Sequence, residues 1–242
     1  MHIKIKHALL LSILSITSYT LFAQASLDSI INSYFTAIGG KDKIQQINSE
    51  YMEGTLEVMG NSGTSTTYVL NGKGFKNVVD FGGQQVIQVI TDTGAWTVNP
   101  FMGSPDPTPL PKDQYTVAKD QIYIGGALLH YPSDNSTSLQ LLGTENVDGK
   151  PAYKIQAVNK DSVKTTYYID SAMHYLVQLS REFGGQTTTA KYSDFRQTDY
   201  GNTMPFKEEL NTPQGIQLTI TVTKAEINKP IDTSVFDMPK KQ

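Results

Sequence analysis

The sequence predicts a mainly β protein of about 11 antiparallel strands, with short helices at the N-terminus and in the middle of the chain. Tyrosine is abundant, with 13 residues, and charged residues make up only 18% of the chain, which suits strands better than helices. From Ser49 onward, apolar and polar residues alternate with a period of two, as in Met52–Val58. Turn pairs such as Asn71-Gly72 and Asp148-Gly149 separate the alternating segments and indicate hairpins.

The first 25 residues have the features of a secretory signal peptide. Lys4 and Lys6 precede an apolar stretch, and Ala23-Gln24-Ala25 supplies a cleavage site of the A-x-A type. The apolar stretch is too short and too rich in serine and threonine to span a bilayer stably. The chain contains no cysteine, so we do not expect acylation next to the cleavage site. We therefore expect a soluble periplasmic protein without a lipid anchor, consisting of a single domain over residues 26–242.

After the signal, an apolar stripe at helical spacing predicts a helix from Asp28 to Ile38, ended by Gly39-Gly40. One or two further helical turns follow over residues 41–47. The run Val86–Ile90 is apolar on both faces of its strand, so we expect it to be covered on both sides. In this half of the chain the alternation predicts strands near residues 49–58, 64–70, 74–81, 84–91 and 96–98.

A proline-rich interruption separates the two halves of the strand pattern. Five prolines fall within twelve residues, from Pro100 to Pro111, and predict a break in regular structure. Asp113 is a candidate N-terminal residue for a helix in the mixed segment that follows, which ends near Pro132. Strands are then predicted over residues 139–147, 151–158, 163–170, 175–183, 187–196, 203–211 and 216–227.

The sequence offers no catalytic residue, metal site or cofactor motif. His130 and His174 are far apart in sequence and lack an acidic partner at helical spacing, so a metal site is unsupported. There is no cysteine nucleophile and no Gly-x-Ser-x-Gly motif. Glu208 and Glu209 are neighbours on a predicted strand and therefore point to opposite faces. The net charge of −3 and the presence of only two arginines argue against a nucleic-acid surface.

Large apolar residues gather beside the proline-rich interruption. A segment of this kind next to a curved sheet is suited to act as a lid over an apolar pocket. An ordinary hydrophobic core is the alternative interpretation of the same residues. The candidate ligand-binding residues of the pocket and lid are Trp96, Phe101, Met102, Tyr123, Leu128 and Leu129.

Four blocks carry a resemblance to a known family: IINSYFTAIGGKDKIQQINSEYMEGTLEV (Ile30–Val58), LLGTENVDGKPAYKIQAVNKDSVKTTYYIDSAMHYLVQLS (Leu141–Ser180), YSDFRQTDYGNTMPFKEE (Tyr192–Glu209) and VFDMP (Val235–Pro239). In these blocks the chain resembles the outer-membrane lipoprotein-sorting (LolA/LolB-like) superfamily of bacterial periplasmic proteins, in the form common in Bacteroidetes. The blocks are structural signatures made of turns, strand pairs and a helix end. None of them is a catalytic motif.

The resemblance implies an incomplete, half-closed antiparallel β-barrel around an apolar cavity, with the N-terminal and mid-chain helices forming a lid or plug. It also implies a non-enzymatic carrier or chaperone that binds a lipid or a lipoprotein acyl chain in transport through the periplasm. A membrane partner in the envelope is compatible with this role, although the basic cluster by which the sorting chaperone docks is missing here. We expect a monomer. The alternative is a protein-interaction or accessory module with the same fold and a cavity filled by side chains.

Overall fold

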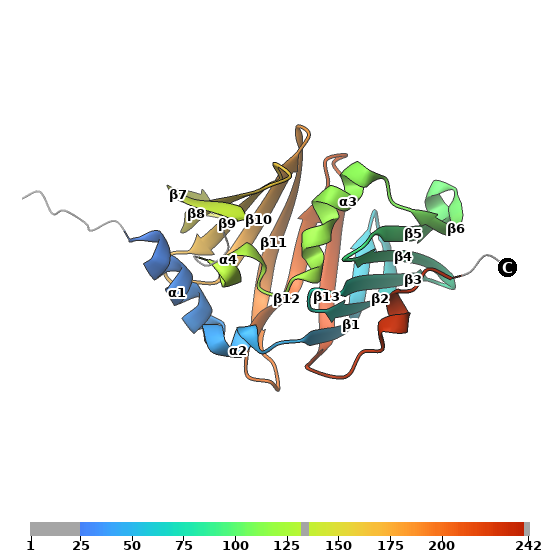
Figure 1. The fold of residues 1–242 in the computed structure, drawn as a ribbon, viewed down its shortest axis with the longest axis horizontal. Coiled ribbons are helices and arrows are strands. Elements are labelled where there is room, and N and C mark those ends of the chain that lie inside the picture. Colours follow the sequence, from blue (N-terminus) through green and yellow to red (C-terminus); the bar gives the residue numbers. More distant parts are fainter. Residues whose placement is uncertain (1–24, 132–135, 240–242) are drawn as a thin grey trace, which may run out of the picture.

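A computed structural model describes residues 25–131 and 136–239, and the predicted signal peptide lies almost wholly outside these ranges. The described residues form one 13-stranded antiparallel sheet that does not close, accompanied by a few short helices (Figure 1). Among the described residues, no helix combines the length and the apolar character that a membrane crossing requires.

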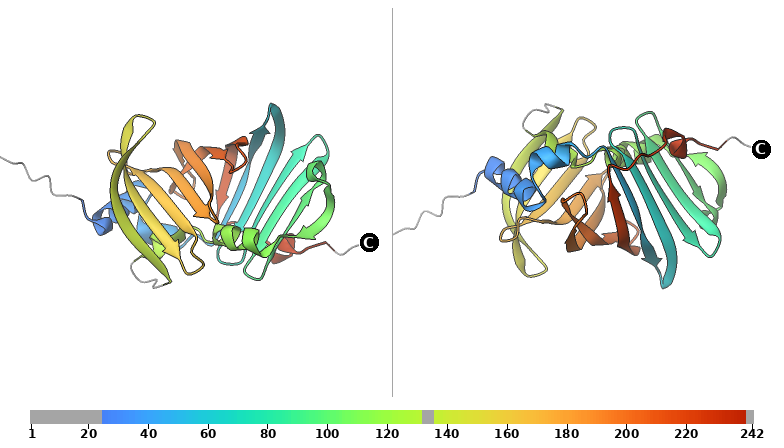
Figure 2. Two further views of the ribbon diagram at one scale, coloured as in Figure 1. Left: turned by 90° about the horizontal axis from the view of Figure 1, so that it is seen from above. Right: turned by 90° about the horizontal axis from the view of Figure 1, so that it is seen from below.

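The sheet has two wings that meet at its centre. The chain runs outward through the first wing, crosses to the far edge of the sheet, and returns through the second wing until β13 pairs with β1. The free edges are therefore β6 and β7 (Figure 2). The first wing consists of β1 (Ser49–Val58), β2 (Asn61–Leu70), β3 (Gly74–Phe81), β4 (Gln84–Thr91), β5 (Ala95–Asn99) and β6 (Ser104–Pro109). The second wing consists of β7 (Thr137–Val147), β8 (Lys150–Asn159), β9 (Lys164–Asp170), β10 (Leu176–Phe183), β11 (Gln186–Gln197), β12 (Thr203–Asn211) and β13 (Gln217–Ile227).

The expected break in regular structure over the whole proline-rich segment is wrong: this segment adds a strand to the twelve ranges predicted above, which gives 13. After a short 3-10 helix η1 (Pro100–Met102), Ser104–Pro109 forms the edge strand β6. Ser104 and Thr108 pair with Asn99 and Thr97 of β5, Pro109 lies opposite Trp96, and the amide of Leu110 donates to the Ala95 carbonyl at 2.9 Å. Proline is tolerated on an edge strand because the missing N–H would face solvent. The prolines also leave this edge with fewer donors for pairing with another chain.

Helices cover the inner face of the sheet, defined here as the face that packs against the residues between the two wings. These residues form the crossing segment, 111–131, with α3 (Lys112–Ala118), η2 (Lys119–Ile122) and α4 (Gly126–His130). The N-terminal helices α1 (Leu27–Ala37) and α2 (Lys41–Gln45) join α4 over the second wing (Figures 1 and 2). The largest cluster of buried apolar side chains lies there and includes Ile30, Phe35, Leu128 and Ile155.

The run Val86–Ile90 on β4 is covered on both sides, as its composition predicts. On the inner face, Ile90 packs in one cluster with Ala118 and Ile122 of the crossing segment. On the outer face, Val89 and Trp96 pack with Phe236 of η3 (Thr233–Phe236). A Cβ atom at Gly74 would lie 2.7 Å from the Phe236 ring, so glycine is needed for this close approach.

Candidate functional site

A cavity of about 770 Å³ lies between the crossing segment and the inner face of the second wing. Its sheet wall comes from β8, β9 and β10, where alternate residues such as Ala157, Tyr167 and Leu179 point inward and pair across neighbouring strands. Its other wall is the crossing segment, with Tyr34 of α1 at one side. This volume lies in the range of roughly 300–1,000 Å³ that is usual for small-molecule sites.

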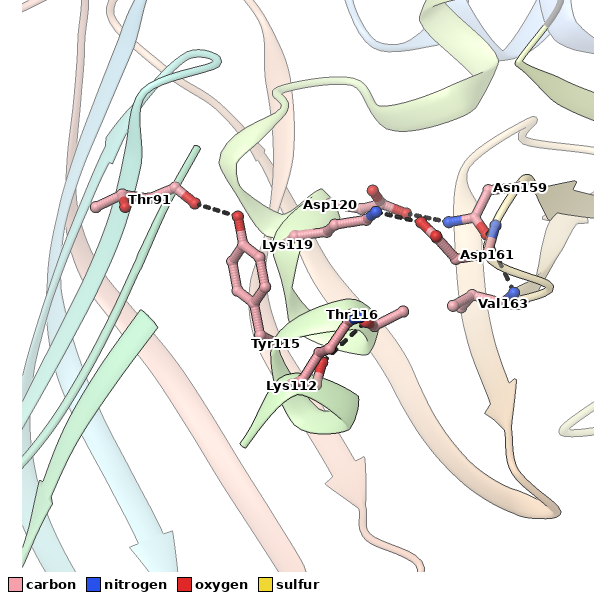
Figure 3. A network of polar contacts seen from close by, with 9 residues as sticks. All are labelled: Thr91, Lys112, Tyr115, Thr116, Lys119, Asp120, Asn159, Asp161 and Val163. Carbon is pink, nitrogen blue, oxygen red and sulfur yellow. Dashed lines mark hydrogen bonds and ion pairs between the residues drawn. The ribbon is translucent and has the colours of Figure 1, made fainter. Parts of the chain in front are cut away.

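The crossing segment is tied to both wings by polar contacts (Figure 3). Toward the first wing, the Tyr115 hydroxyl donates to the carbonyl oxygen of Thr91 at 3.0 Å. Toward the second wing, the Lys119 ammonium forms an ion pair with Asp161, and Asn159 Nδ2 donates to Asp120 at 3.2 Å. The hydrogen bond from Lys119 holds the pKa of the Asp161 carboxyl below its usual value. These partly exposed contacts close the cavity without an extensive apolar seal.

Polar groups also line the interior of the cavity. Arg181 on β10 reaches the cavity, and its buried Nε has no hydrogen-bond partner among the described residues. Tyr167, which is buried, lies on β9 opposite Leu179, and burial raises the pKa of its hydroxyl while the Arg181 charge opposes that rise. Burial also raises the pKa of the Tyr34 hydroxyl. The cavity therefore combines apolar surface with polar groups, among them the Arg181 guanidinium and the hydroxyls of Tyr34 and Tyr167, and its lining also includes Lys119, Asp120 and Asp161.

A smaller cavity of about 150 Å³ lies on the other side of Tyr34, and Glu50 and Tyr192 are among the residues that line it. Burial raises the pKa of the Glu50 carboxyl to about 7. Glu208 on β12 pairs across the sheet with Tyr192 on β11, and burial raises its pKa to about 7 as well. Both carboxyls are therefore partly protonated near neutral pH, which is unusual for glutamate.

The structure brings two of the six candidate pocket residues to the large cavity. Tyr123, which is 47% exposed, and Leu128, which is buried, both line it. Leu129 is buried beside them in the main core and packs against Gly125. All three lie on or next to α4 in the crossing segment.

The other three candidates lie away from the cavity. Trp96 is buried on the outer face of the first wing, where its Nε1 donates to the carbonyl oxygen of Phe236 at 3.1 Å. Phe101 and Met102 on η1 are exposed, and the Phe101 ring contacts Phe81 edge to face with centroids 5.8 Å apart. The gathering of aromatic residues in the sequence thus marks several separate places in the fold.

The polar lining was not predicted, because the candidate pocket residues were inferred from the apolar and aromatic pattern of the sequence alone. A signal was present: Arg181 stands two residues after Leu179, so strand alternation places both on the inner face. Glu50 has the same relation to Met52 on β1. A charged residue in phase with inward-facing apolar neighbours therefore indicates a cavity. In residues 25–131 and 136–239, no group of three or more histidine, aspartate or glutamate side chains could hold a metal ion.

Comparison with solved structures shows that this fold is known. A domain named as an outer membrane lipoprotein-sorting protein, from Vibrio parahaemolyticus, superimposes with a TM-score of 0.58 and 10% identity, over 86% of this chain and 95% of the other. A DUF1329 family protein from Desulfovibrio piger gives 0.59 and 12%, over 87% and 96%. A LolA superfamily protein from Nitrosomonas europaea gives 0.56 and 13%, over 85% and 96%. No protein-family model matches the sequence, and no curated protein matches it. At these identities the similarity concerns the fold.

Proposed function

We propose that this protein is a non-enzymatic periplasmic carrier that holds a lipid, or the acyl chain of a lipoprotein, in the cavity beneath the crossing segment. In this proposal the open sheet acts as a half-barrel and the crossing segment as its lid. The observation that carries the proposal is the cavity of about 770 Å³ on the inner face of the second wing. The similarity in fold to a lipoprotein-sorting domain supports the same function.

The physical need for such a carrier follows from the hydrophobic effect. Each acyl CH₂ group removed from water contributes about 0.8 kcal/mol. A fourteen-carbon chain left in water therefore costs on the order of 10 kcal/mol. Apolar walls that include Ile122, Leu128 and Leu179 provide a place to bury such a chain. Tyr123 and Leu128 are the candidate residues that we propose contact the ligand.

Ile122 and Leu128 anchor the crossing segment in the core, and polar contacts hold it at the mouth of the cavity, so the mouth side of the segment suits the role of a lid. The Lys119–Asp161 ion pair and the Asp120–Asn159 hydrogen bond are partly exposed and join it to the turn between β8 and β9. Exposed ion pairs contribute only about 0–1 kcal/mol each, so separating the crossing segment from the β8–β9 turn requires little free energy. The alternative of a protein-interaction module requires a filled interior, and the volume of the cavity favours the carrier.

A binding experiment with a matched pair of variants tests the proposal. Leu179 faces the cavity, whereas Gln178 on the same strand faces outward beside Tyr168. Leu179→Trp fills part of the cavity and should weaken binding of a dansyl-labelled fatty acid roughly tenfold. Gln178→Trp adds the same side chain to the outer face and should leave the affinity within twofold.

Native mass spectrometry of the protein purified from its own host provides an independent check. We expect a bound species with the mass of a lipid, released by organic extraction. Protein that is consistently lipid-free and that fails to bind the labelled fatty acid would overturn the carrier proposal. Equal affinities for the Leu179→Trp and Gln178→Trp variants would show that the ligand binds elsewhere.

A further inference from the structure

The two arginines of the chain lie in contrasting surroundings. Arg196 is on the surface, where Nε and Nη2 donate to the two carboxylate oxygens of Asp194 at 2.9 and 2.6 Å, and its guanidinium stacks over Phe206. Arg181 lines the large cavity instead. Among the described residues it has no ion-pair partner, and its buried Nε has no hydrogen-bond partner. Arg181 is half-buried, and a cation partly removed from water without a counter-charge is unfavourable, so Arg181 calls for a structural or functional explanation.

The acidic residues around the cavity do not supply that counter-charge. Asp161 pairs with Lys119, Asp120 accepts from Asn159, and Asp92 lies 3.5 Å from Lys73. The strand neighbours of Arg181 are also uncharged, because it pairs with Thr165 on β9 and with Thr188 on β11. The charge of Arg181 therefore remains available to a molecule inside the cavity.

Glu50 and Glu208, the two buried carboxyls of the inner face, do not neutralise Arg181 either. Glu50 lines the smaller cavity and Glu208 lines neither cavity. The groups that sense the Arg181 charge are the hydroxyls of Tyr167 and Tyr192. Since burial raises the pKa of both carboxyls to about 7, they are also partly uncharged near neutral pH.

Arg181 and the hydroxyls near it form one polar part of a cavity whose lining also contains apolar side chains and, at the turn between β8 and β9, the charged residues Lys160 and Asp161. The Tyr167 hydroxyl, which hydrogen-bonds with the backbone of Ala127, is influenced by the Arg181 charge, and Tyr34 adds a second hydroxyl to the same cavity. Leu179 on the same strand and Leu128 on the lid supply apolar surface. An amphiphile with one charged group and one hydrocarbon chain matches this division.

We infer that the ligand is an anionic amphiphile whose carboxylate or phosphate headgroup is bound by Arg181 inside the large cavity. This inference rests on the proposed carrier function and specifies its ligand class. The planar guanidinium can donate two parallel hydrogen bonds to either headgroup, which a neutral alcohol or ester does not reproduce. Binding also supplies the counter-charge that the protein itself does not provide.

Three probes share one hydrocarbon chain and differ in headgroup: dodecanoic acid, dodecyl phosphate and dodecanol. Each is used to displace a neutral fluorescent amphiphile, so that the contribution of headgroup charge to affinity can be compared with that of the hydrocarbon. The wild-type protein should bind at least one of the anions about tenfold or more tightly than the alcohol, as expected for a charge-assisted hydrogen bond in a buried site. The stronger of the two anions identifies a carboxylate or a phosphate as the preferred headgroup.

Variants at the two arginines provide the matched comparison. Arg181→Met should remove the preference for anions and leave dodecanol binding within twofold, whereas Arg181→Lys should keep part of the preference. Arg196→Met should change neither. Because the Arg181 side chain gives up no protein hydrogen bond at Nε, we expect these variants to fold, and Arg181→Gln provides a second uncharged replacement.

The outcomes separate this inference from the carrier function on which it rests. Equal binding of all three probes by the wild-type protein, or an anion preference that survives Arg181→Met and Arg181→Gln, would overturn the role of Arg181 and leave the carrier function standing. Failure of every probe to bind the wild-type protein would overturn both.

Discussion

The two wings of the sheet use their inner faces differently. In the first wing, Ile90 packs against Ile122 of the crossing segment, while on the outer face Trp96 packs against Phe236. This part of the first wing is therefore filled on both sides. In the second wing, α4 packs on the strands through Leu128, and beside this contact a cavity of about 770 Å³ remains, into which Arg181 reaches.

The comparison shows that aromatic residues in the sequence do not by themselves indicate where the cavity lies. The single tryptophan of the chain stabilises a filled core, and its indole N–H is satisfied by the Phe236 carbonyl. The cavity is marked instead by inward-facing polar side chains such as Arg181 and Tyr167, which a close-packed core would exclude. The following predictions test the division between a structural wing and a wing that we propose binds the ligand.

The largest expected effect is on the stability of the first wing. Trp96→Ala removes a buried indole and its hydrogen bond, and should lower the free energy of unfolding by about 3–5 kcal/mol. Chemical denaturation measures this loss, and Met102→Ala, at an exposed position, should change it by less than about 0.5 kcal/mol. Fatty-acid affinity of folded Trp96→Ala should stay within twofold of the wild type. Loss of binding in this variant would move the ligand site to the first wing.

A smaller effect is expected from the buried carboxyls between the wings. Because the folded-state pKa of Glu50 and of Glu208 is raised to about 7 from the ordinary 4.5, the folded protein binds more protons between these values. The free energy of unfolding should therefore fall as pH rises from about 4.5 through 7. Glu50→Gln and Glu208→Gln should each recover roughly 1–3 kcal/mol at pH 8 and little at pH 4.5.

The control for this pH dependence lies on the same strand as Glu50. Glu57 is exposed on β1 and faces outward, so Glu57→Gln should leave the pH dependence of stability unchanged. Denaturation curves at pH 4.5, 6 and 8 provide the comparison. If Glu50→Gln and Glu57→Gln behave alike at all three values, Glu50 does not have the buried environment described above.

Much of the fold could be predicted from the sequence because strand alternation and turn pairs are local signals. The prediction failed at Ser104–Pro109, which forms a strand. An edge position removes the penalty for proline, and whether a strand lies at an edge depends on the whole topology. The crossover that brings β13 beside β1 is equally non-local.

The candidate site could be predicted only in part for a related reason. The sequence predicts a lid near the proline-rich segment, and Tyr123 and Leu128 of the crossing segment line the cavity, while their contact with a ligand is a proposal. Which wing this segment covers is decided by contacts between distant residues, such as Lys119 with Asp161. The inward phase of Arg181 was available from strand alternation alone, whereas its lack of a partner required the structure.

The most direct test of the central claim is to map where a hydrocarbon chain lies in the bound protein. A fatty acid with a diazirine in its chain can be photo-crosslinked to the protein and the adducts located by peptide mass spectrometry. The account predicts saturable adducts on β8–β10 and on the crossing segment, around Leu179 and Leu128, which an unlabelled fatty acid prevents. Adducts confined to the outer face around Trp96 and η3, or the absence of saturable labelling, would contradict it.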